Sequence, residues 1–378
     1  MPETKPALAI DRAQLATNIA AIHHQVMSEA SPGEDLRHLK KMQLWGRICT
    51  WLGYATAWII PNPISAFLIS QGIFTRWTLI THPISHGGYD KIPGVPSRYT
   101  SKGFASGWRR FLDWNDWIHP DAWHQEHNRL HHYNLGEQSD PDQIQFNMRW
   151  LRESKKPLWL RYLFIAIFAC VWKAAYYAPK ALMELRRERA KKSGETALNT
   201  FATWKAWSLF TSHGRELWFK YFLPYFGFRF IIVPALFLPL GQQAVLFVFI
   251  NSVLAEIFTN LHGFLVIVPN HTGDDVPMFN ENKSGRGEFF FRQIVGSVNY
   301  KTGNDRVDFM HGWLNYQIEH HIWPKMSLRL YQKAQPKVRE LCEQYGIPYT
   351  QDSVFKRLLK AVDVMVGRTS MLEQPAVS

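Results

Sequence analysis

The chain has 378 residues, of which 46% are hydrophobic, and its formal net charge is +12 at neutral pH. This charge could indicate a nucleic-acid partner, but no nucleic-acid-binding motif accompanies it and the basic residues flank apolar runs, so anionic lipid headgroups explain it better. The three cysteines are too few and too scattered for a disulfide framework or a thiolate metal site. Because apolar residues gather into long runs with few charges, we predict an all-α, multi-pass membrane protein.

The first 42 residues precede the longest apolar runs and are expected to form a cytoplasmic N-terminal segment, 1–42. Apolar residues recur at helical spacing over Leu15–Val26, after a capping Asp11, which predicts an amphipathic helix. His23 and His24 lie on this helix without a partner cluster, and we interpret them as surface residues. No signal-peptide pattern is present, so the first membrane segment is expected to act as its own insertion signal.

Four apolar stretches are long enough to span a bilayer, which takes about 20 residues as helix. They are Gln43–Ile60, Ile64–Ile80, Phe222–Leu240 and Gln243–Val268. Short uncharged connections join them in pairs, so we expect two transmembrane hairpins. Lys and Arg crowd the segment between the hairpins, and the positive-inside rule therefore places both termini and the histidine clusters in the cytoplasm.

A fifth apolar stretch, Leu158–Ala178, contains Arg161 and Lys173 and is flanked by basic segments on both sides. We therefore predict an interfacial helix that lies along the membrane. The membrane domain is expected to cover residues 43–327. Residues 328–378 form a predicted cytoplasmic helical tail, which ends in an amphipathic helix whose apolar residues are Val354, Phe355, Leu358, Leu359 and Val362.

The first histidine cluster, HPISH, directly follows the second predicted span. His82 and His86 are separated by four residues, which places both imidazoles on one face of a helix that continues into the cytoplasm. Pro83 favours a kink unless it lies in the first turn of a helix. A pair at this spacing suits metal binding, although an isolated pair is a weak signal.

The second cluster lies in WIHPDAWHQEHNRLHH and is the densest. On one α-helix His124, His127 and His131 share a face, with His132 beside it. His119 precedes a proline and is expected in the preceding loop. His124 is predicted either as a ligand or as a hydrogen-bond partner of one. The alternative is a wet interfacial helix rich in Trp and His.

The third cluster, QIEHH, brings Gln317, His320 and His321 to one side of a helix. Glutamine is a weak metal ligand, so Gln317 is expected to orient a metal-bound water or a neighbouring histidine. Glu319 faces away from that side and is predicted to be solvated or paired. Three paired clusters on one side of a membrane indicate a polynuclear metal site, because imidazole binds iron and other first-row metals well.

Polar residues near the end of the fourth span are further candidates. His262 follows in NLHGF and His271 in VPNH, and both could supply another ligand. Glu256 and Asn260 are ionisable or polar groups within the apolar stretch, where they are costly unless functional. The alternative is that these residues form hydrogen bonds between helices.

The order H-x-x-x-H, H-x-x-x-H-H and Q-x-x-H-H between membrane hairpins resembles the integral-membrane fatty acid desaturase family. QIEHH and the SDPD segment at Ser139–Asp142 resemble the front-end and sphingolipid-type members. The resemblance implies a cytoplasmic helical cap that holds a di-iron site, dioxygen chemistry on an acyl chain, and Asp142 as a further site candidate. By matching position, it implies the ligands His82, His86, His127, His131, His132, His320 and His321, with His262 as the nearest match to a ligand that the family draws from its last membrane helices.

The resemblance also implies a source of electrons. The segment before the first span is too short for the fused cytochrome domain that many front-end members carry, so electrons are expected from a separate ferredoxin or cytochrome. The basic stretch Arg186–Lys192 is a candidate docking surface for that carrier, or equally a lipid-headgroup contact. A bacterial inner membrane is the expected location.

Three functions remain open from the sequence. The first is an acyl-lipid desaturase, and the second is a hydroxylase or ketolase that acts on a lipid, sphingoid base or carotenoid with the same iron site. The third, from another class, is a membrane metal transporter or a receptor-like bundle with a zinc site. Transport would need polar residues along the spans, whereas the histidines cluster at cytoplasmic ends.

Overall fold

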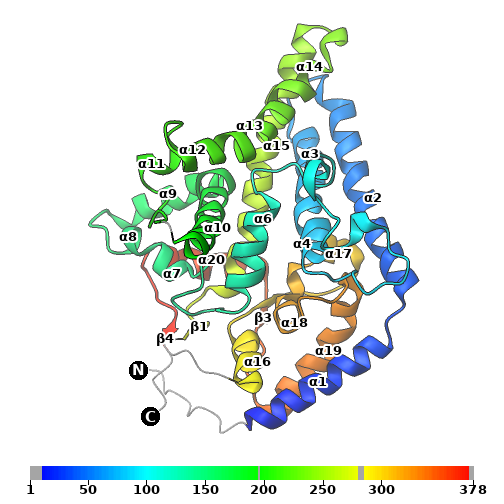
Figure 1. The fold of residues 1–378 in the computed structure, drawn as a ribbon, viewed down its shortest axis with the longest axis vertical. Helices are drawn as coiled ribbons and strands as arrows, with labels where there is room; N and C mark the ends of the chain where they lie inside the picture. Colours follow the sequence, from blue (N-terminus) through cyan, green and yellow to red (C-terminus); the bar gives the residue numbers. More distant parts are fainter. Residues whose placement is uncertain (1–10, 195, 280–284, 374–378) are drawn as a thin grey trace.

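The computed structural model describes residues 11–194, 196–279 and 285–373. Its described part is mostly helical and elongated (Figure 1), with α14 (Val233–Ala235) at the narrow upper end. The opposite end is broad and contains α1 (Arg12–Ser28), α16 (Arg286–Val295) and α19 (Leu328–Tyr345). The apolar bundle and the histidine-bearing helices therefore occupy different levels of one molecule.

The first helical hairpin pairs α2 (Pro32–Ala57) with α3 (Pro63–Thr75), which continues through a π-helical turn at Arg76–Thr81 into α4 (His82–Ser85). Glycines let the two helices approach closely. A Cβ atom at Gly53 would lie 2.6 Å from the Ile69 side chain, and one at Gly72 would overlap Thr50. Small residues at such contacts hold membrane helices together. This packing sets the direction in which α4 presents the first histidine pair.

Among the residues that the structure describes, two helices are long and apolar enough to cross a membrane, Ser212–Leu240 and Gln242–His271. The first contains α12 (Ser212–Glu216), α13 (Leu223–Phe226) and α14, and the second is α15 (Gln242–Ile267) with the turn that follows it. Asn251 of α15 is fully buried and hydrogen-bonds the α2–α3 connection at Ala57, Ile60 and Asn62. The two helical pairs are therefore joined at their outer ends.

The predicted spans Gln43–Ile60 and Ile64–Ile80 form the α2–α3 hairpin but do not reach the same apolar character, and each contains an arginine. Large apolar side chains are nevertheless exposed near the tip of this hairpin. Trp51 is 65% exposed and Ile64 is 71% exposed. The hairpin thus presents an apolar surface at the same end as α14.

The single interfacial helix predicted over Leu158–Ala178 is replaced by two helices. α9 (Leu158–Ala169) is followed by a bend of 88° and then by a helix over Lys173–Ser193, whose main part is α10 (Ala178–Ser193). The physical reason lies at Lys173, whose ammonium group is fully buried and lies 2.9 Å from the Asp116 carboxylate. The chain turns inward to make this ion pair, so the pair of helices is a broken or re-entrant segment.

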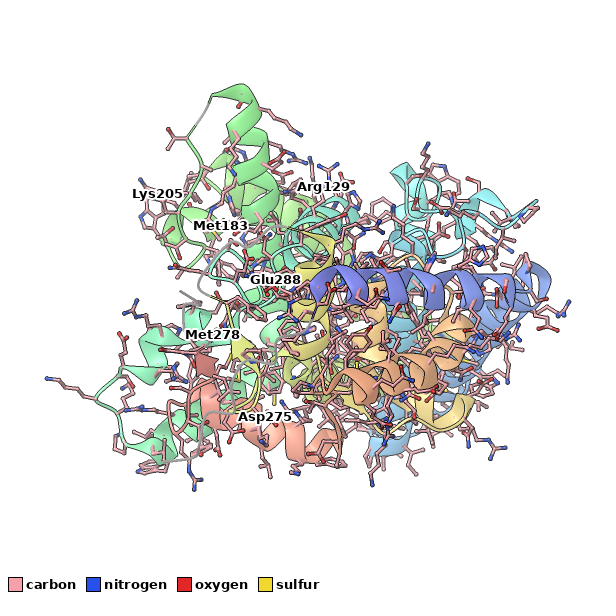
Figure 2. All side chains as sticks on the ribbon, turned by 90° about the horizontal axis from the view of Figure 1, so that it is seen from below. Arg129, Met183, Lys205, Asp275, Met278 and Glu288 are labelled. Carbon is pink, nitrogen blue, oxygen red and sulfur yellow. The ribbon has the colours of Figure 1, made fainter. Side chains whose placement is uncertain are left out.

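The broad lower end is a cap of packed helices. α1 begins at an Asp11 N-cap, as predicted, and buries Leu15, Ile19 and Val26 against α16 and α19. Figure 2 shows α1 crossing this face beside Glu288 of α16. Two small parallel strand pairs depart from the all-α expectation: β1 (Pro277–Met278) with β4 (Leu372–Glu373), and β2 (Asn299–Tyr300) with β3 (Gln351–Asp352).

The predicted C-terminal amphipathic helix is confirmed as α20 (Val354–Met365). Its buried face consists of Val354, Arg357, Ala361, Val364 and Met365, whereas Phe355 and Leu359 are exposed. α20 packs on α15, on α9 and on α7 (Ile144–Asn147).

Candidate metal centre

The first histidine pair lies at α4, the short α-helical turn that follows the π-helical turn Arg76–Thr81. His82 is its first residue and His86 is its C-cap. The backbone amide of His86 donates to the carbonyl of His82 at 3.2 Å, so the two rings lie on one side of the chain. Pro83 is at the second position of this turn, where its missing N–H is tolerated. The local sequence therefore aims His82 and His86 into one site.

The second cluster lies on a π-helix over His124–His131 that follows α6 (Pro120–Trp123). The amide of His132 donates to the carbonyl of His127, five residues earlier. A π-helix brings residues five apart onto one side, so His127 joins His132 in the first group, while the His131 ring, stacked 5.4 Å from that of His127, belongs to the second. The α-helical spacing assumed from the sequence would instead have paired His127 with His131.

The third cluster lies on α18 (Gln317–Ile322), a short helix whose six residues are all buried. Consecutive residues on an α-helix point about 100° apart. His320 and His321 therefore face two different neighbours. The fourth contributor is His271, at the end of the turn Val268–His271 that continues α15.

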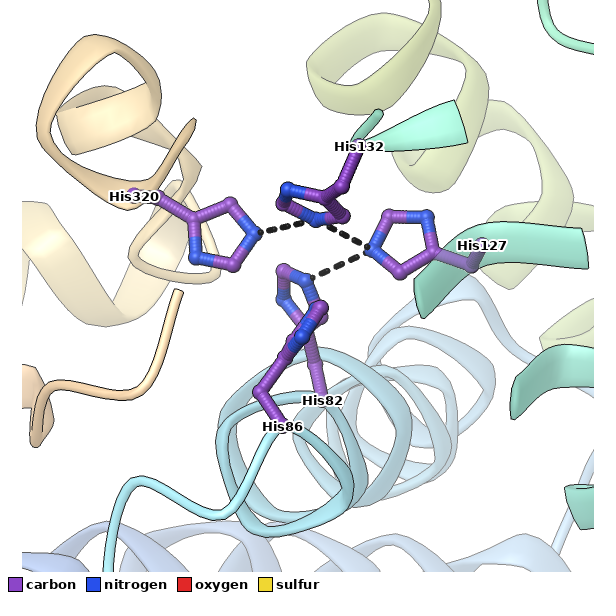
Figure 3. A group of neighbouring side chains, drawn as sticks. All are labelled: His82, His86, His127, His132 and His320. Atoms are coloured by element: carbon purple, nitrogen blue, oxygen red, sulfur yellow. Dashed lines mark hydrogen bonds between the residues drawn. The ribbon is translucent and has the colours of Figure 1, made fainter. Parts of the chain in front are cut away.

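These elements assemble two adjacent histidine groups. In the first, five ring nitrogens lie within 4.8 Å of one another (Figure 3), and they belong to His82, His86, His127, His132 and His320. In the second, the same limit holds for His131, His271 and His321. The rings of His132 and His321 stack at 4.3 Å, so the two groups share a border.

The distances in the first group suit a shared metal ion. The Nε2 atom of His127 lies 3.0 Å from that of His82 and 3.3 Å from that of His132, and the Nε2 atoms of His132 and His320 are 3.1 Å apart. Two imidazole nitrogens bound to one metal at about 2.1 Å lie about 3.0 to 3.4 Å apart. The ring nitrogens are thus already at the spacing of common ligands.

Hydrogen bonds on the far side of the rings set their orientation. His131 Nδ1 lies 2.9 Å from buried Asp140, and His321 Nδ1 lies 2.9 Å from the Gln293 amide oxygen. His271 Nδ1 is 3.0 Å from the Gly296 carbonyl. A bond of this kind fixes the proton on Nδ1 and leaves Nε2 free to bind a metal.

Gln317 contacts one of the histidines rather than extending the ligand set itself. Its amide nitrogen lies 2.9 Å from His271 Nε2. The contact is on the nitrogen that the Gly296 hydrogen bond leaves unprotonated, so a metal ion bound to His271 would displace it, and the orienting role expected for Gln317 stays a prediction.

The chemistry of the donor set fits a metal ion. Within the described residues, the buried Nε2 atoms of His86 and His321 have no hydrogen-bond partner, which is costly without a ligand. Burial, together with the neighbouring histidines, holds the pKa of His127, His132, His320 and His321 well below the usual range. Neutral imidazole is the form that binds metals.

His131 differs from the other rings because a carboxylate lies beside it. Burial alone would lower its pKa, but Asp140 outweighs burial and the pKa of His131 is raised. A carboxylate in this position makes an imidazole a stronger donor to a metal. Asp142 is more distant, with an oxygen 3.9 Å from His131 Nδ1, and it forms a further compact group with His127 and His131.

Some predicted residues lie outside both groups. His262 is occupied by other partners: its Nδ1 is 3.0 Å from the Gln71 amide and its Nε2 is 2.7 Å from the Met310 carbonyl, while its ring stacks on Phe74. His124 is exposed and contacts Asn128. His262 therefore lies outside both groups, whereas His271 lies in the second one.

Asn260 and Glu256 belong to a separate buried network. Glu256 accepts hydrogen bonds from the Trp117 indole at 2.7 Å and the Tyr225 hydroxyl at 2.6 Å, and Asn260 donates to the Glu256 carbonyl. This matches the alternative considered for them, hydrogen bonding between helices. Glu319 also turns inward, where Asn299 and Tyr349 donate to its carboxylate.

The sequence did not single out the residues that orient the rings. These residues are Asp140, Gln293 and Tyr331, which lie far from one another in the chain. The Tyr331 hydroxyl is 3.2 Å from His320 Nδ1. Only Asp140 had a local signal, because it belongs to the SDPD segment after the second cluster.

An apolar pocket lies against both histidine groups. His82, His127, His131 and His271 line one part of it, and Gln317 and Asp142 are close by. The remaining wall is mostly aromatic and apolar, and includes Trp77, Trp123, Phe168, Trp172, Tyr177 and Phe264. A pocket of this kind can accept a long hydrocarbon chain and exclude water from the neighbouring histidine groups.

Comparisons with known proteins agree with these features. The chain is similar to the NADPH-dependent stearoyl-CoA 9-desaturase of Mycobacterium tuberculosis, with 26% identity over 286 residues, which cover 72% of this chain and 60% of that protein. It is also similar to an acyl-lipid (8-3)-desaturase of Mortierella alpina, with 23% identity over 44% of this chain and 34% of that protein. A Delta 8-(E)-sphingolipid desaturase of Lachancea kluyveri is 35% identical over 24% of this chain and 16% of its own length.

The match to a family is broader than the match to any of these relatives. Residues 56–353 match the fatty acid desaturase family, and this region contains all three histidine clusters and His271. The resemblance stated from the histidine spacing is thereby confirmed, and the chain belongs to the fatty acid desaturase family.

Proposed function

We propose that this protein is a membrane di-iron desaturase that introduces a carbon–carbon double bond into a fatty acyl chain at the expense of dioxygen. The observation that carries the proposal is the position of eight histidines in two adjacent groups against an apolar pocket. His82, His86, His127, His132 and His320 would hold one iron, and His131, His271 and His321 the other. Family membership supports the same chemistry.

The reaction removes one hydrogen atom from each of two neighbouring methylenes. Dioxygen takes up these two hydrogen atoms together with two electrons from the carrier and two protons, and leaves as two waters. Bound iron would supply the activation of dioxygen and the removal of hydrogen from an unactivated C–H bond. The chain's own residues supply position and exclusion of water. Trp77, Trp172 and Phe264 line the pocket that would hold the acyl chain beside the histidines.

We further propose that the α2–α3 hairpin and the pair Ser212–Leu240 and Gln242–His271 all cross the membrane, with the cap and both termini in the cytoplasm. The exposed apolar side chains near Trp51 and Ile64 support this arrangement for the first hairpin. A bacterial inner membrane is the proposed location.

Electrons would come from a separate ferredoxin-type or cytochrome-type carrier. The candidate docking surface at Arg186–Lys192 carries less free charge than its sequence suggests. Arg186 and Arg189 both pair with Glu216, and Arg187 pairs with Glu184. A carrier that docks by charge alone therefore gains less from this surface, and a lipid-headgroup contact remains equally compatible with it.

A hydroxylase or ketolase with the same iron site is the second candidate, because hydrogen removal is common to both reactions. A metal transporter or zinc-binding bundle is the third. The buried Glu256 and Asn260 do not favour transport, because Trp117 and Tyr225 already donate to the Glu256 carboxylate. Asn260 accepts from the Lys173 backbone amide and donates to the Glu256 carbonyl of its own helix.

The function is tested by a lipid profile. The wild type, His320→Ala and His124→Ala are expressed in a host of simple membrane composition, and acyl species are compared by mass spectrometry. We expect acyl chains two hydrogens lighter than their precursors in the wild type and in His124→Ala, and none in His320→Ala. His124 is the matched control because it lies in the same histidine-rich stretch but is exposed.

Products one oxygen heavier than their precursors would instead identify a hydroxylase. Purified protein that contains zinc without iron, consumes no oxygen and leaves the host lipids unchanged would contradict the enzyme proposal and favour the third candidate.

A further inference from the structure

The helix α20 completes the pocket wall although it lies beyond the region that matches the family. That region ends at residue 353, and α20 begins at Val354. Its last residue, Met365, is 3% exposed and lines the pocket together with Met148 and with Ile144 of α7. This side of the pocket therefore combines Ile144 and Met148 from the matched region with Met365 from outside it.

Buried charge fixes α20 to the body of the protein. Arg357 is fully buried, and its guanidinium donates at 2.7 Å to both oxygens of Asp275 and at 3.1 Å to the Thr272 carbonyl. Lys360 adds a second ion pair to Asp275 at 2.9 Å. Nη1 of this buried guanidinium contacts both oxygens of the partly exposed Asp275 carboxylate, and Nη2 contacts the Thr272 carbonyl, so α20 has a defined position relative to residues 272–275.

The other end of α20 is held by arginines of α8 (Arg149–Arg152) and α9. Arg152 donates to the carbonyls of Val364 and Thr369, and Arg161 donates to that of Val366. Met365 lies between these acceptors. Its backbone is therefore held in place, and only its flexible side chain can adapt to what the pocket contains.

The same contacts connect the pocket wall to the second histidine group. Thr272 directly follows His271, so the residues that Arg357 binds belong to the segment that presents this histidine. His271 and Met365 both line the pocket. An acyl chain between them would meet a histidine and an α20 side chain whose separation is set by one buried ion pair.

We propose that α20 is a wall of the acyl-binding site and that Met365 is a specificity-determining residue, whose side chain sets which methylenes of the acyl chain lie beside the second histidine group. This inference rests on the proposed function. A smaller side chain at this position leaves room for a longer or differently bent chain, and a larger one excludes it. One methylene in an apolar pocket changes selectivity about 10-fold or more.

The first experiment compares Met365→Ala, Met365→Trp and Met365→Leu with Phe355→Ala, expressed in cells that receive saturated fatty acids of several lengths. Phe355 is the matched control because it lies on the same helix and is 66% exposed. We expect the ratio of long-chain to short-chain products, or the ratio of double-bond isomers, to change about 10-fold. The change should have opposite directions in Met365→Ala and Met365→Trp. Met365→Leu conserves volume and should keep the wild-type profile.

The second experiment does not depend on turnover. Purified wild-type protein is photolabelled with a diazirine-bearing stearic acid, and the labelled peptides are sequenced by mass spectrometry. We expect label on α20 that unlabelled stearic acid displaces. Label confined to other elements, or identical product ratios in folded Met365→Ala, Met365→Trp and Phe355→Ala, would overturn the inference. If α20 carries displaceable label but no host shows desaturated products, α20 still lines the acyl-binding site, and the proposed reaction is contradicted.

Discussion

Two buried polar clusters flank the same apolar pocket and differ in how their polar atoms are satisfied. In the network around Lys173, the ammonium group lies 2.9 Å from Asp116 and 3.8 Å from Glu256, whose carboxylate also accepts from Trp117 and Tyr225. Charges of both signs and hydrogen-bond donors are present together. This network is complete within the protein, and its role is to hold the bend after α9 against α15.

The histidine groups are arranged in the opposite way. Their Nε2 atoms converge on one another, and those of His86 and His321 have no hydrogen-bond partner among the described residues. Carboxylates and carbonyls lie only on the outer sides of the rings, as Asp140 does beside His131. Burial of polar groups is therefore no sign of metal binding in itself. The sign is a set of ring nitrogens that converge on one space, although the Gln317 amide lies 2.9 Å from one of them, His271 Nε2.

The largest expected change is in the free energy of unfolding, when the cation of the Lys173 network is removed. Lys173→Met leaves two buried carboxylates without their cation, and breaking one partner of a buried ion pair costs about 3–5 kcal/mol of unfolding free energy. Thermal unfolding of the purified protein in detergent measures it. Iron per folded molecule should not change.

Lys192→Met is the control, because Lys192 is 70% exposed and pairs with Glu188 on the same helix. Its cost should be within about 0.5 kcal/mol. Equal stability of the two variants would mean that the buried network contributes nothing, and the contrast with the histidine groups would fail.

A smaller effect is expected where a carboxylate serves a histidine. Asp140→Asn keeps the shape of the side chain but removes the charge beside His131, and the loss of such a partner weakens metal affinity about 10–100-fold, or about 1.4–2.7 kcal/mol. Competition of the loaded protein with a chelator measures this affinity. Ser139→Ala, at an exposed neighbouring position, should bind as the wild type does. Equal affinity of all three proteins would contradict the role of Asp140.

The smallest expected change in unfolding free energy concerns Glu288, which pairs with Arg12 and Arg292 at the edge of the cap. Burial disfavours the charged form of Glu288, but hydrogen bonds from Arg292 and the charge of Arg12 prevail, so its pKa is lowered. The lowered pKa stabilises the fold above the unfolded value of about 4.3, and this contribution is lost as the pH falls through the folded pKa.

We therefore expect Glu288→Gln to cost about 1 kcal/mol at neutral pH and to match the wild type in acid, below the folded pKa. Unfolding measured over a pH series checks this convergence. Glu343→Gln is the control, because Glu343 is 63% exposed. A difference between Glu288→Gln and wild type that persists in acid would show that lost packing, rather than lost charge, is responsible.

The sequence predicted much of this molecule because its signals are local. Apolar runs and helix caps are determined by residues close together in the sequence, so the helices at Arg12–Ser28 and Val354–Met365 could be predicted. The convergence of three histidine clusters followed from their position at the ends of apolar segments. The bend after Ala169 could not be foreseen, because it depends on Asp116, which is distant in the chain.

The choice between His262 and His271 also depends on distant residues. Both follow the same apolar stretch, and no periodicity separates them. His262 is occupied by Gln71 and by the Met310 carbonyl, from two other parts of the chain. The Gly296 carbonyl instead holds His271 Nδ1, and the His271 ring lies beside those of His131 and His321. Only the packed structure brings these partners together.

The π-helix in the second histidine cluster acts as one residue inserted into an α-helix. His127 and His132 meet because five residues, rather than four, complete that turn. Deletion of Asn128 would restore ordinary helical register and rotate His131 and His132 by about 100° relative to the preceding turn. The two-group arrangement would then be lost although every histidine is retained. In this protein the length of one turn, as much as the identity of its residues, decides which imidazole belongs to which group.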